Sequence, residues 1–333
     1  MRVYADLRWP ARSGIGVVQA EMLARLPAGI DIVDLGVKTR IGSPLSPWHL
    51  ARSLRDLRAR SGVFWSAGFM PPASSSVPSV VTVHDLTHLH HYTRLHAIYY
   101  QRVLRHLYLK CRNVICVSEY TRREFVEWSG FPAERAVTVY NGVSSALARG
   151  RGAKPLPFSY VLYVGNRRPH KNLRRLITGY ARSKLPTNGI RLVLTGHPDG
   201  ELERAAAAAG APSTLYFAGD PDQEGIASLY GGAHMVAYPS LYEGFGLPIL
   251  EAMMAGVPVL TSSVTSMPEV AGNAASLVDP TSIEDIVAAL DRLAFDAELR
   301  QLLVARGYER VERFSWDASA GQVWEIVARA GEV

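Results

Sequence analysis

Short apolar segments recur along the chain, and each leads into turn-forming residues and then into a helical pattern of apolar side chains. They lie at residues 80–83, 114–117, 161–164, 191–195, 214–218, 235–238 and 257–261. Strands of this kind, alternating with helices, are typical of parallel sheets covered by helices and not of β-sandwiches or helical bundles. The pattern predicts the α/β class, with two doubly wound parallel sheets.

The length and one interruption in the pattern predict two domains. A chain of 333 residues is long for a single core. Residues 146–159 are rich in Gly, Pro and basic side chains and lack an apolar period, which is typical of an exposed linker. We therefore expect one domain at 1–155 and a second at 156–314. Ser315, followed by apolar residues at helical spacing, predicts a last helix at about 315–333.

The composition limits the cellular compartments and the binding partners that we expect for this chain. The chain has only two cysteines, lacks a secretory apolar stretch at its start, and contains no apolar run of the length that spans a bilayer. These features predict a cytoplasmic protein. Residues 1–155 carry 21 Lys and Arg against 10 Asp and Glu, whereas residues 156–333 carry 15 against 20. The basic first half suits either an anionic partner, such as lipid headgroups at the inner face of the membrane, or a merely solvated surface. No nucleic-acid-binding motif is present, so we expect no nucleic acid partner.

The segment at 239–263 is the most informative for chemistry. It holds Glu243 and Glu251, separated by a Gly244-Phe245-Gly246 turn and by the expected start of a helix near Leu247 or Pro248. Glycines let backbone N–H groups approach an anion closely, and the positive end of a helix points at the same place. The arrangement predicts a site for a diphosphate.

This segment resembles the E-x7-E region of retaining GT-B glycosyltransferases, especially glycosyltransferase family 4. The resemblance implies two Rossmann-like domains facing a central cleft, with the C-terminal helix joined to the N-terminal domain. It further implies that Glu243 contacts the donor sugar, that Glu251 holds the ribose hydroxyls, and that the backbone of Phe245, Gly246 and Leu247 meets sugar and phosphate. Transfer would proceed with retention, and neither a metal nor a cofactor would be required.

A second segment, at 160–180, places Gly165 after a buried strand and a basic cluster before a helix. Strand, glycine, cations and helix start together form a phosphate site. The segment resembles the family motif whose basic pair neutralises the leaving diphosphate, which implies this role for Lys171. Arg168 is the preferred partner, and Arg167 remains an alternative.

In the first half, His84 and Asp85 end the strand at 80–83 and therefore lie at the edge where α/β sheets bind ligands. The family has a similar His near the reacting sugar, so both residues join Lys171 and Glu243 as catalytic candidates. Gly14 and Gly16 resemble the family's amino-terminal glycine loop and are donor-binding candidates. The histidines between 84 and 96 lack a metal-binding motif, and Asp222 in the Asp220-Pro-Asp222 sequence suits a helix start, so no metal site is predicted.

The resemblance is greatest to bacterial mannosyltransferases, on the segments HDLTHLHHYTR and VGNRRPHKN. It implies GDP-mannose as donor and a glycan or lipid-linked acceptor in surface polysaccharide synthesis. Two alternatives stay open: a UDP-sugar-dependent transferase of the same fold, and a non-catalytic partner subunit that binds nucleotide sugars.

Overall fold

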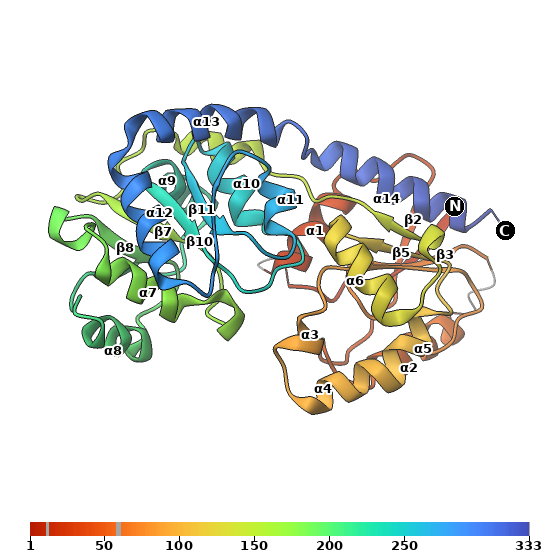
Figure 1. The fold of residues 1–333 in the computed structure, drawn as a ribbon. Helices are drawn as coiled ribbons and strands as arrows, with labels where there is room; N and C mark the ends of the chain where they lie inside the picture. The colour runs from red at the N-terminus through yellow and green to blue at the C-terminus, as the bar shows by residue number, and fades with distance from the viewer. Residues whose placement is uncertain (11–12, 58–60, 333) are drawn as a thin grey trace. The chain divides into compact units, whose positions relative to one another are not determined.

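The computed structural model describes residues 1–10, 13–57 and 61–332, which form two compact units (Figure 1). The N-terminal unit comprises Met1–Gly142 together with Ser315–Val333, and the C-terminal unit comprises Val143–Phe314. Each unit is built on one six-stranded sheet whose strands are all parallel. The predicted class of two doubly wound parallel sheets is confirmed.

The sheet of the N-terminal unit has the strand order β2-β1-β3-β4-β5-β6. Its strands are β1 (Arg2–Ala5), β2 (Asp31–Asp34), β3 (Val63–Ser66), β4 (Ser79–Val83), β5 (Asn113–Cys116) and β6 (Ala136–Thr138). Its helices include α1 (Gly14–Leu23), α2 (Ser46–Asp56), α3 (Thr87–His90), α6 (Glu119–Ser129) and α14 (Trp316–Ala330). Strand order reverses at β1, so the loops after β1 and β3 leave the sheet at its switch point.

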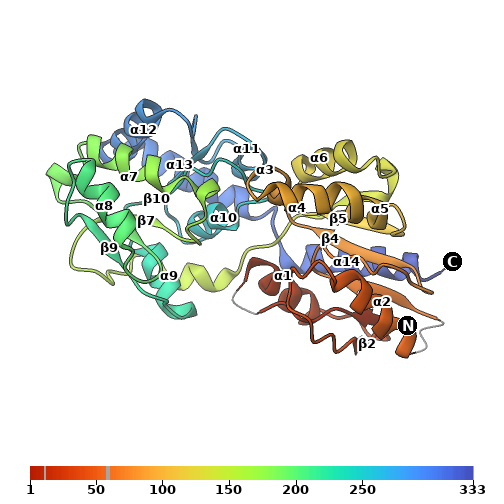
Figure 2. The same cartoon turned by 90° about the horizontal axis from the view of Figure 1, so that it is seen from below.

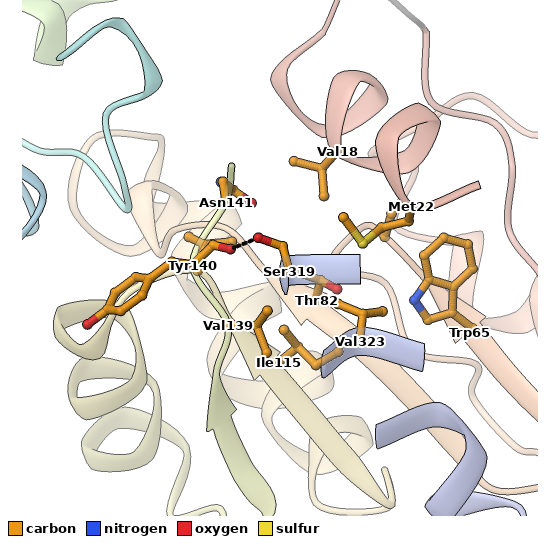
Figure 3. Close-up of a pocket in the computed structure, with 12 residues that line it drawn as sticks. Val18, Met22, Trp65, Thr82, Ile115, Val139, Tyr140, Asn141, Ser319 and Val323 are labelled. Carbon is orange, nitrogen blue, oxygen red and sulfur yellow. Dashed lines mark hydrogen bonds between the residues drawn. The ribbon is translucent and has the colours of Figure 1, made fainter. Parts of the chain in front are cut away.

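Successive residues of each strand serve opposite faces of this sheet. Phe64 packs in a cluster with side chains of α2 and α6, whereas its neighbour Trp65 lies 4.8 Å, ring to ring, from Trp324 of α14. Trp324 Nε1 donates to the carbonyl of Met22. Ser319 Oγ donates to the carbonyl of Tyr140 (Figure 3). The last helix thus completes the core of the N-terminal unit. The cavity drawn in Figure 3 measures only about 10 Å³, which is too small for a ligand.

The basic segment after the histidines forms one unbroken run of helical residues from Arg94 to Tyr108. It consists of α4 (Arg94–Tyr99), a π-helical turn η1 (Tyr100–Leu104) and α5 (Arg105–Tyr108). Within this segment Tyr100 and Leu104 are buried, whereas Leu95 and Ile98 are exposed. The middle turn of this helix is therefore π-helical and not α-helical.

The sheet of the C-terminal unit has the order β12-β11-β10-β7-β8-β9. Its strands are β7 (Tyr160–Tyr163), β8 (Arg191–Leu194), β9 (Leu215–Phe217), β10 (Met235–Tyr238), β11 (Val259–Ser262) and β12 (Ser276–Val278). Its helices are α7 (Leu173–Arg182), α8 (Gly200–Ala208), α9 (Gln223–Gly231), α10 (Leu247–Met254), α11 (Met267–Ala271), α12 (Ile283–Phe295) and α13 (Ala297–Val311). The switch point lies between β7 and β10, which pair with each other at the centre of the sheet.

The division between the units lies at Gly142 and not near residue 155. The 3₁₀ helix η3 (Ser145–Gly150) packs against α9 of the C-terminal unit. The contact is tight: a side chain at Gly150 would meet the backbone of Ala227, and one at Gly231 would meet the backbone of Gly150. Only the later part of the predicted linker, from residue 151 to 159, is largely exposed. In the described ranges, none of the helices is both long enough and apolar enough to cross a bilayer.

Candidate active site

The loops after β7 and β10 bring the main candidate residues of the C-terminal unit together. Ligands of doubly wound sheets bind beyond the carboxyl ends of the strands at the switch point, and these two strands flank it. Lys171 follows β7 and Glu243 follows β10. The Nζ of Lys171 donates to Glu243 Oε1 at 2.6 Å and to the hydroxyl of Tyr238 at 2.8 Å. The sequence had predicted both charged residues but not Tyr238.

Local contacts fix the loop that carries Lys171. Residues Pro169–Lys171 form a short 3₁₀ helix, and Asn172 ends it in the left-handed region with φ of 63°. The Asn172 side chain donates to the carbonyls of Pro239 and Pro280, at 2.9 and 2.7 Å. The backbone N–H of Leu241 donates to the carbonyl of His170 at 2.7 Å. These bonds tie the loop after β7 directly to the loop after β10.

The turn from Glu243 to Gly246 is held in a similar way. Ser266 Oγ donates to the carbonyls of Glu243 and Phe245, at 2.9 and 3.0 Å, and the N–H of Glu243 donates to Thr265 Oγ1. Gly246 has φ of 105°, a conformation that favours glycine. Leu247 follows as the first residue of α10, and Gly244 and Phe245 are buried within the turn. The start of α10 therefore faces the same edge of the sheet as Lys171.

Glu251 lies one turn further along α10, at a second buried tyrosine. The hydroxyl of Tyr230, on α9, donates to Glu251 Oε2 at 2.5 Å. Burial raises the pKa of Glu251 above its ordinary value, while the bond from Tyr230 acts in the opposite direction. Burial, and secondarily the charge of Glu243, also raises the pKa of Tyr238 well above its ordinary value, so this hydroxyl stays protonated. The two carboxylates thus have separate tyrosine partners.

The two arginines after Gly165 differ in their surroundings. Arg167 donates to the carbonyl of Thr195 at 2.9 Å, pairs with Asp199 at 3.5 Å, and stacks over the ring of Phe217. Arg168 is exposed, and its backbone N–H donates to Asn166 Oδ1. Gly165 has φ of 138° and is exposed as well. The guanidinium of Arg167 is therefore already engaged at the neighbouring strands β8 and β9.

In the N-terminal unit, His84 and Asp85 follow β4 at the carboxyl edge of the sheet. The Nε2 of His84 lies 2.6 Å from the carbonyl of Ala67, which follows β3. Burial lowers the pKa of His84, and the contact with Ala67 opposes this only in part. A neutral ring that donates from Nε2 has an unprotonated Nδ1, which is an acceptor. Asp85 Oδ1 accepts from the N–H of Thr87 at 2.8 Å and so helps to start α3.

The two candidate glycines, Gly14 and Gly16, lie in the first turn of α1, which Ser13 caps by accepting from the N–H of Gly16. A side chain at Gly16 would come within 1.9 Å of the Pro10 carbonyl oxygen, whereas one at Gly14 would meet nothing within 4 Å. Gly16 is thus required by packing, and Gly14 leaves open space at the helix start.

The described part of the chain contains no group of three or more His, Cys, Asp or Glu side chains gathered as metal ligands would be. The histidines after β4 have other contacts: His88 stacks on Tyr92 and Tyr100, and His90 bonds Glu124. Asp222 caps α9 by accepting from the N–H of Gly225, as predicted for a helix-start residue.

Comparison with known proteins gives matches over most of the chain. The family described as "Glycosyl transferases group 1" matches residues 146–310, and "Glycosyltransferase Family 4" matches residues 17–147. The O-antigen chain mannosyltransferase B of Escherichia coli is 32% identical over 82% of this chain and 75% of that protein. The serotype-specific mannosyltransferase WbdA of Escherichia coli is 28% identical over 62% of this chain, which spans only 27% of that protein.

Solved structures share the fold. The Anabaena protein HepE, in complex with UDP and glucose, superimposes with a TM-score of 0.76 at 16% identity, over 98% of this chain and 99% of that one. At this identity the likeness establishes the architecture, which is that of GT-B glycosyltransferases. The family matches and the similarity to mannosyltransferase B establish more: the chain belongs to the glycosyltransferases of group 1 and family 4.

Proposed function

We propose that this glycosyltransferase moves a mannosyl group from GDP-mannose to a hydroxyl of a glycan or lipid-linked acceptor in bacterial surface polysaccharide synthesis. Transfer occurs with retention of anomeric configuration and without a metal ion. The observation that carries the proposal is the Lys171–Glu243 pair at the switch point, at the turn that begins α10. Relatives named as mannosyltransferases of O-antigen chains support the sugar and the type of acceptor.

In this proposal the C-terminal unit holds the donor and absorbs the charge of its leaving group. Breaking the bond between the anomeric carbon and phosphate leaves negative charge on the diphosphate, and fixed cations and amides aimed at that charge lower the barrier. Lys171 supplies the cation, and the amides at the start of α10 supply further donors. Within the described residues, Glu243 and Tyr238 are the hydrogen-bond partners of Lys171 Nζ, which leaves its third N–H for an anion.

The carboxylates take different tasks. Glu251, held by Tyr230, accepts from the ribose hydroxyls of the nucleotide, and Glu243 accepts from hydroxyls of the donor sugar. His84, kept neutral by burial, offers Nδ1 as an acceptor to the reacting sugar. Arg168, which is exposed, is the preferred partner of the diphosphate, and Arg167, which contacts Thr195 and Asp199, is the alternative.

A panel of nucleotide sugars tests the donor. GDP-mannose should raise the melting temperature of the protein, whereas UDP-glucose, ADP-glucose and dTDP-glucose at equal concentration should not, since only a bound ligand stabilises the native state. The structural likeness to a protein crystallised with UDP and glucose makes a UDP-sugar the specific alternative. A shift with a UDP-sugar alone would replace GDP-mannose in the proposal.

Measurements of sugar transfer test the proposed metal independence, the retention of configuration and the catalytic activity itself. Transfer or slow donor hydrolysis should persist in excess EDTA, and the anomeric proton of the product should show the configuration of the donor. Activity that EDTA abolishes and Mg²⁺ restores would contradict metal independence. Donor binding without any turnover would favour the non-catalytic partner subunit.

We further propose that the N-terminal unit rests on an anionic membrane surface through α4, η1 and α5. Leu95, Ile98 and Leu109 are 76%, 55% and 41% exposed. Between Asp85 and Glu119 the sequence has no acidic residue but five Lys or Arg. Exposed apolar side chains among basic ones are typical of interfacial helices.

Vesicle flotation tests this contact. The protein should float with vesicles that contain phosphatidylglycerol but not with pure phosphatidylcholine, and Leu95→Ser with Ile98→Ser should reduce flotation. Leu277→Ser, at an exposed apolar residue of the C-terminal unit, is the control. Equal flotation of all three proteins would remove the assignment to this surface.

A further inference from the structure

An open cavity of about 800 Å³ lies on the N-terminal unit, away from the candidate donor residues. It is bounded by α3, α4 and η1 on one side and by α6 on the other, and we call it the α4–α6 groove. Figure 2 shows α4 and α6 as neighbours in this unit. The residues that matter here are Gln101, Tyr120, Arg123, Glu124, Glu127 and Trp128. The volume is that of a site for a small organic ligand.

The groove begins at the carboxyl edge of the sheet. Tyr120 lies in the first turn of α6, two residues after Ser118, which caps this helix beyond the end of β5, whereas Trp128 lies in its last turn. Because a helix rises about 1.5 Å per residue, the groove follows α6 for about 12 Å. One end is therefore close to the edge that carries His84, and the other points away from it.

The lining has the chemistry of sugar recognition. Gln101 supplies both a donor and an acceptor, Arg123 supplies donors, and Glu127 supplies acceptors. The rings of Tyr120 and Trp128 add apolar surface that suits the C–H faces of pyranose rings. Glu124 is bonded to His90, which also lines the groove, at 2.6 Å, and Arg123 and Glu127 have opposite charges, so the lining has no positive excess to attract phosphate or anionic lipid headgroups. A neutral, hydroxyl-rich ligand fits best.

The wall of the groove is rigidly connected to the carboxyl edge. Ring centroids lie 5.6 Å apart for Trp9 and Phe69, 5.4 Å for Phe69 and His88, 5.0 Å for His88 and Tyr100, and 5.9 Å for Tyr100 and Trp128. All of these separations are in the range of favourable aromatic contacts. The connection passes through the π-helical turn at Tyr100–Leu104, from which Gln101 lines the groove. Such turns are rare and occur often at functional sites.

We infer that the α4–α6 groove binds a neutral oligosaccharide, namely the part of the acceptor glycan that follows its reacting sugar. The inference rests on the proposed transferase function. It makes the enzyme select acceptors by chain length: a single sugar at the carboxyl edge does not reach Trp128, whereas a longer chain does.

Acceptor kinetics test the inference. Gln101→Ala combined with Glu127→Gln changes two exposed residues of the groove, and Arg102→Gln combined with Glu134→Gln changes two exposed residues outside it. With an α-linked mannotetraose acceptor, the groove variant should show a KM raised about three- to tenfold, since each lost hydrogen bond weakens binding by a small factor. With methyl α-mannoside, its KM should equal that of the wild type, as should its kcat and the melting shift caused by GDP-mannose.

A second measurement does not depend on turnover. In saturation-transfer NMR without donor, the wild type should bind mannotetraose more tightly than mannobiose, and the groove variant should lose this preference while Tyr120→Phe weakens it. An unchanged KM for mannotetraose in the groove variant, or no preference for length in the wild type, would overturn the inference. A wild type that neither responds to nucleotide sugars nor transfers sugar would instead overturn the proposed function.

Discussion

The Lys171–Glu243 pair places a buried cation at the site proposed for the leaving group. The two side chains are only 10% and 12% exposed, and they come from loops on neighbouring strands. A buried charge is tolerated when its partner is present and is costly when the partner is lost. Each residue therefore stabilises the protein and, in the proposed mechanism, also serves the reaction, so single substitutions mix the two effects.

A double variant separates them. Lys171→Met leaves Glu243 buried without its cation and should lower the free energy of unfolding by about 3 kcal/mol. Lys171→Met with Glu243→Gln removes both charges and should recover most of that loss. Turnover should stay about 100- to 1,000-fold below the wild type in both proteins, because the donor for the developing charge is missing. Urea unfolding and initial rates measure the two quantities. A double variant that regains activity along with stability would show that Lys171 acts only in folding.

Glu251 should make stability depend on pH. Its pKa in the folded protein is raised by burial, so the folded state binds the proton more tightly than the unfolded chain. The stability that this provides is complete below the unfolded pKa and is lost as pH rises through the folded value. The Glu251→Gln variant has no carboxyl group to ionise, so its free energy of unfolding relative to wild type should increase as pH rises above the ordinary pKa of a carboxyl group.

The same substitution should weaken binding of the nucleotide, since an amide replaces the carboxylate proposed to hold the ribose. Glu203→Gln, at an exposed position of α8, is the matched control and should follow the wild type in both respects. A difference between Glu251→Gln and wild type that stays flat with pH would mean that the carboxyl group is ionised as easily in the folded state as in the unfolded one.

Among the elements, the start of α1 separates a glycine needed for packing from one available to a ligand. Gly16→Ala should cost about 1 to 3 kcal/mol of stability, because the added methyl group would overlap the Pro10 carbonyl. Gly14→Ala has space and a helical position, so its stability should stay within about 1 kcal/mol of wild type. If the loop approaches the diphosphate, Gly14→Ala should still weaken donor binding. Chemical unfolding and donor titration distinguish the two variants, and equal destabilisation by both would refute this division.

Elements that depend on local patterns were predictable. The strands expected at 80–83, 161–164 and 235–238 are β4, β7 and β10, within a residue at each end, and α10 begins at Leu247 as expected. Short runs of apolar residues predict where strands lie, and helix-start residues predict where helices begin, without knowledge of distant parts of the chain. The π turn at 100–104 was not predictable, because it depends on how Tyr100 and Leu104 are buried against the rest of the unit.

The hydrogen-bond partners of the charged residues in the candidate site could not be predicted from the sequence either. Tyr238 and Tyr230 were missed, although Tyr238 stands at the end of a predicted strand, where a polar side chain is a usable signal. Which tyrosine hydroxyl bonds which charged side chain depends on the order of the strands in the sheet. The spacing of apolar residues along the sequence does not predict that order. The roles of His84, Glu243 and Glu251 toward a donor remain predictions.

At the scale of the whole molecule, the chain enters the N-terminal unit twice. Residues after Ser315 return to it, and α14 places Trp324, only 2% exposed, beside Trp65 of β3. The candidate residues for the nucleotide sugar, apart from the glycine loop and His84 with Asp85, belong to the C-terminal unit. Stability of the first unit and donor binding by the second are therefore carried largely by different parts of the sequence.

Calorimetry of a core variant tests this division. Trp324→Ala removes a buried ring and should destabilise the N-terminal unit by about 3 to 5 kcal/mol, whereas Trp48→Ala, at a half-exposed ring of α2, should have little effect. In the Trp324 variant we expect two thermal transitions, of which the lower is shifted by the substitution and the upper rises with added donor. Because a ligand stabilises only the structure that binds it, a single transition that falls with the substitution and rises with the donor would show that the two units unfold as one.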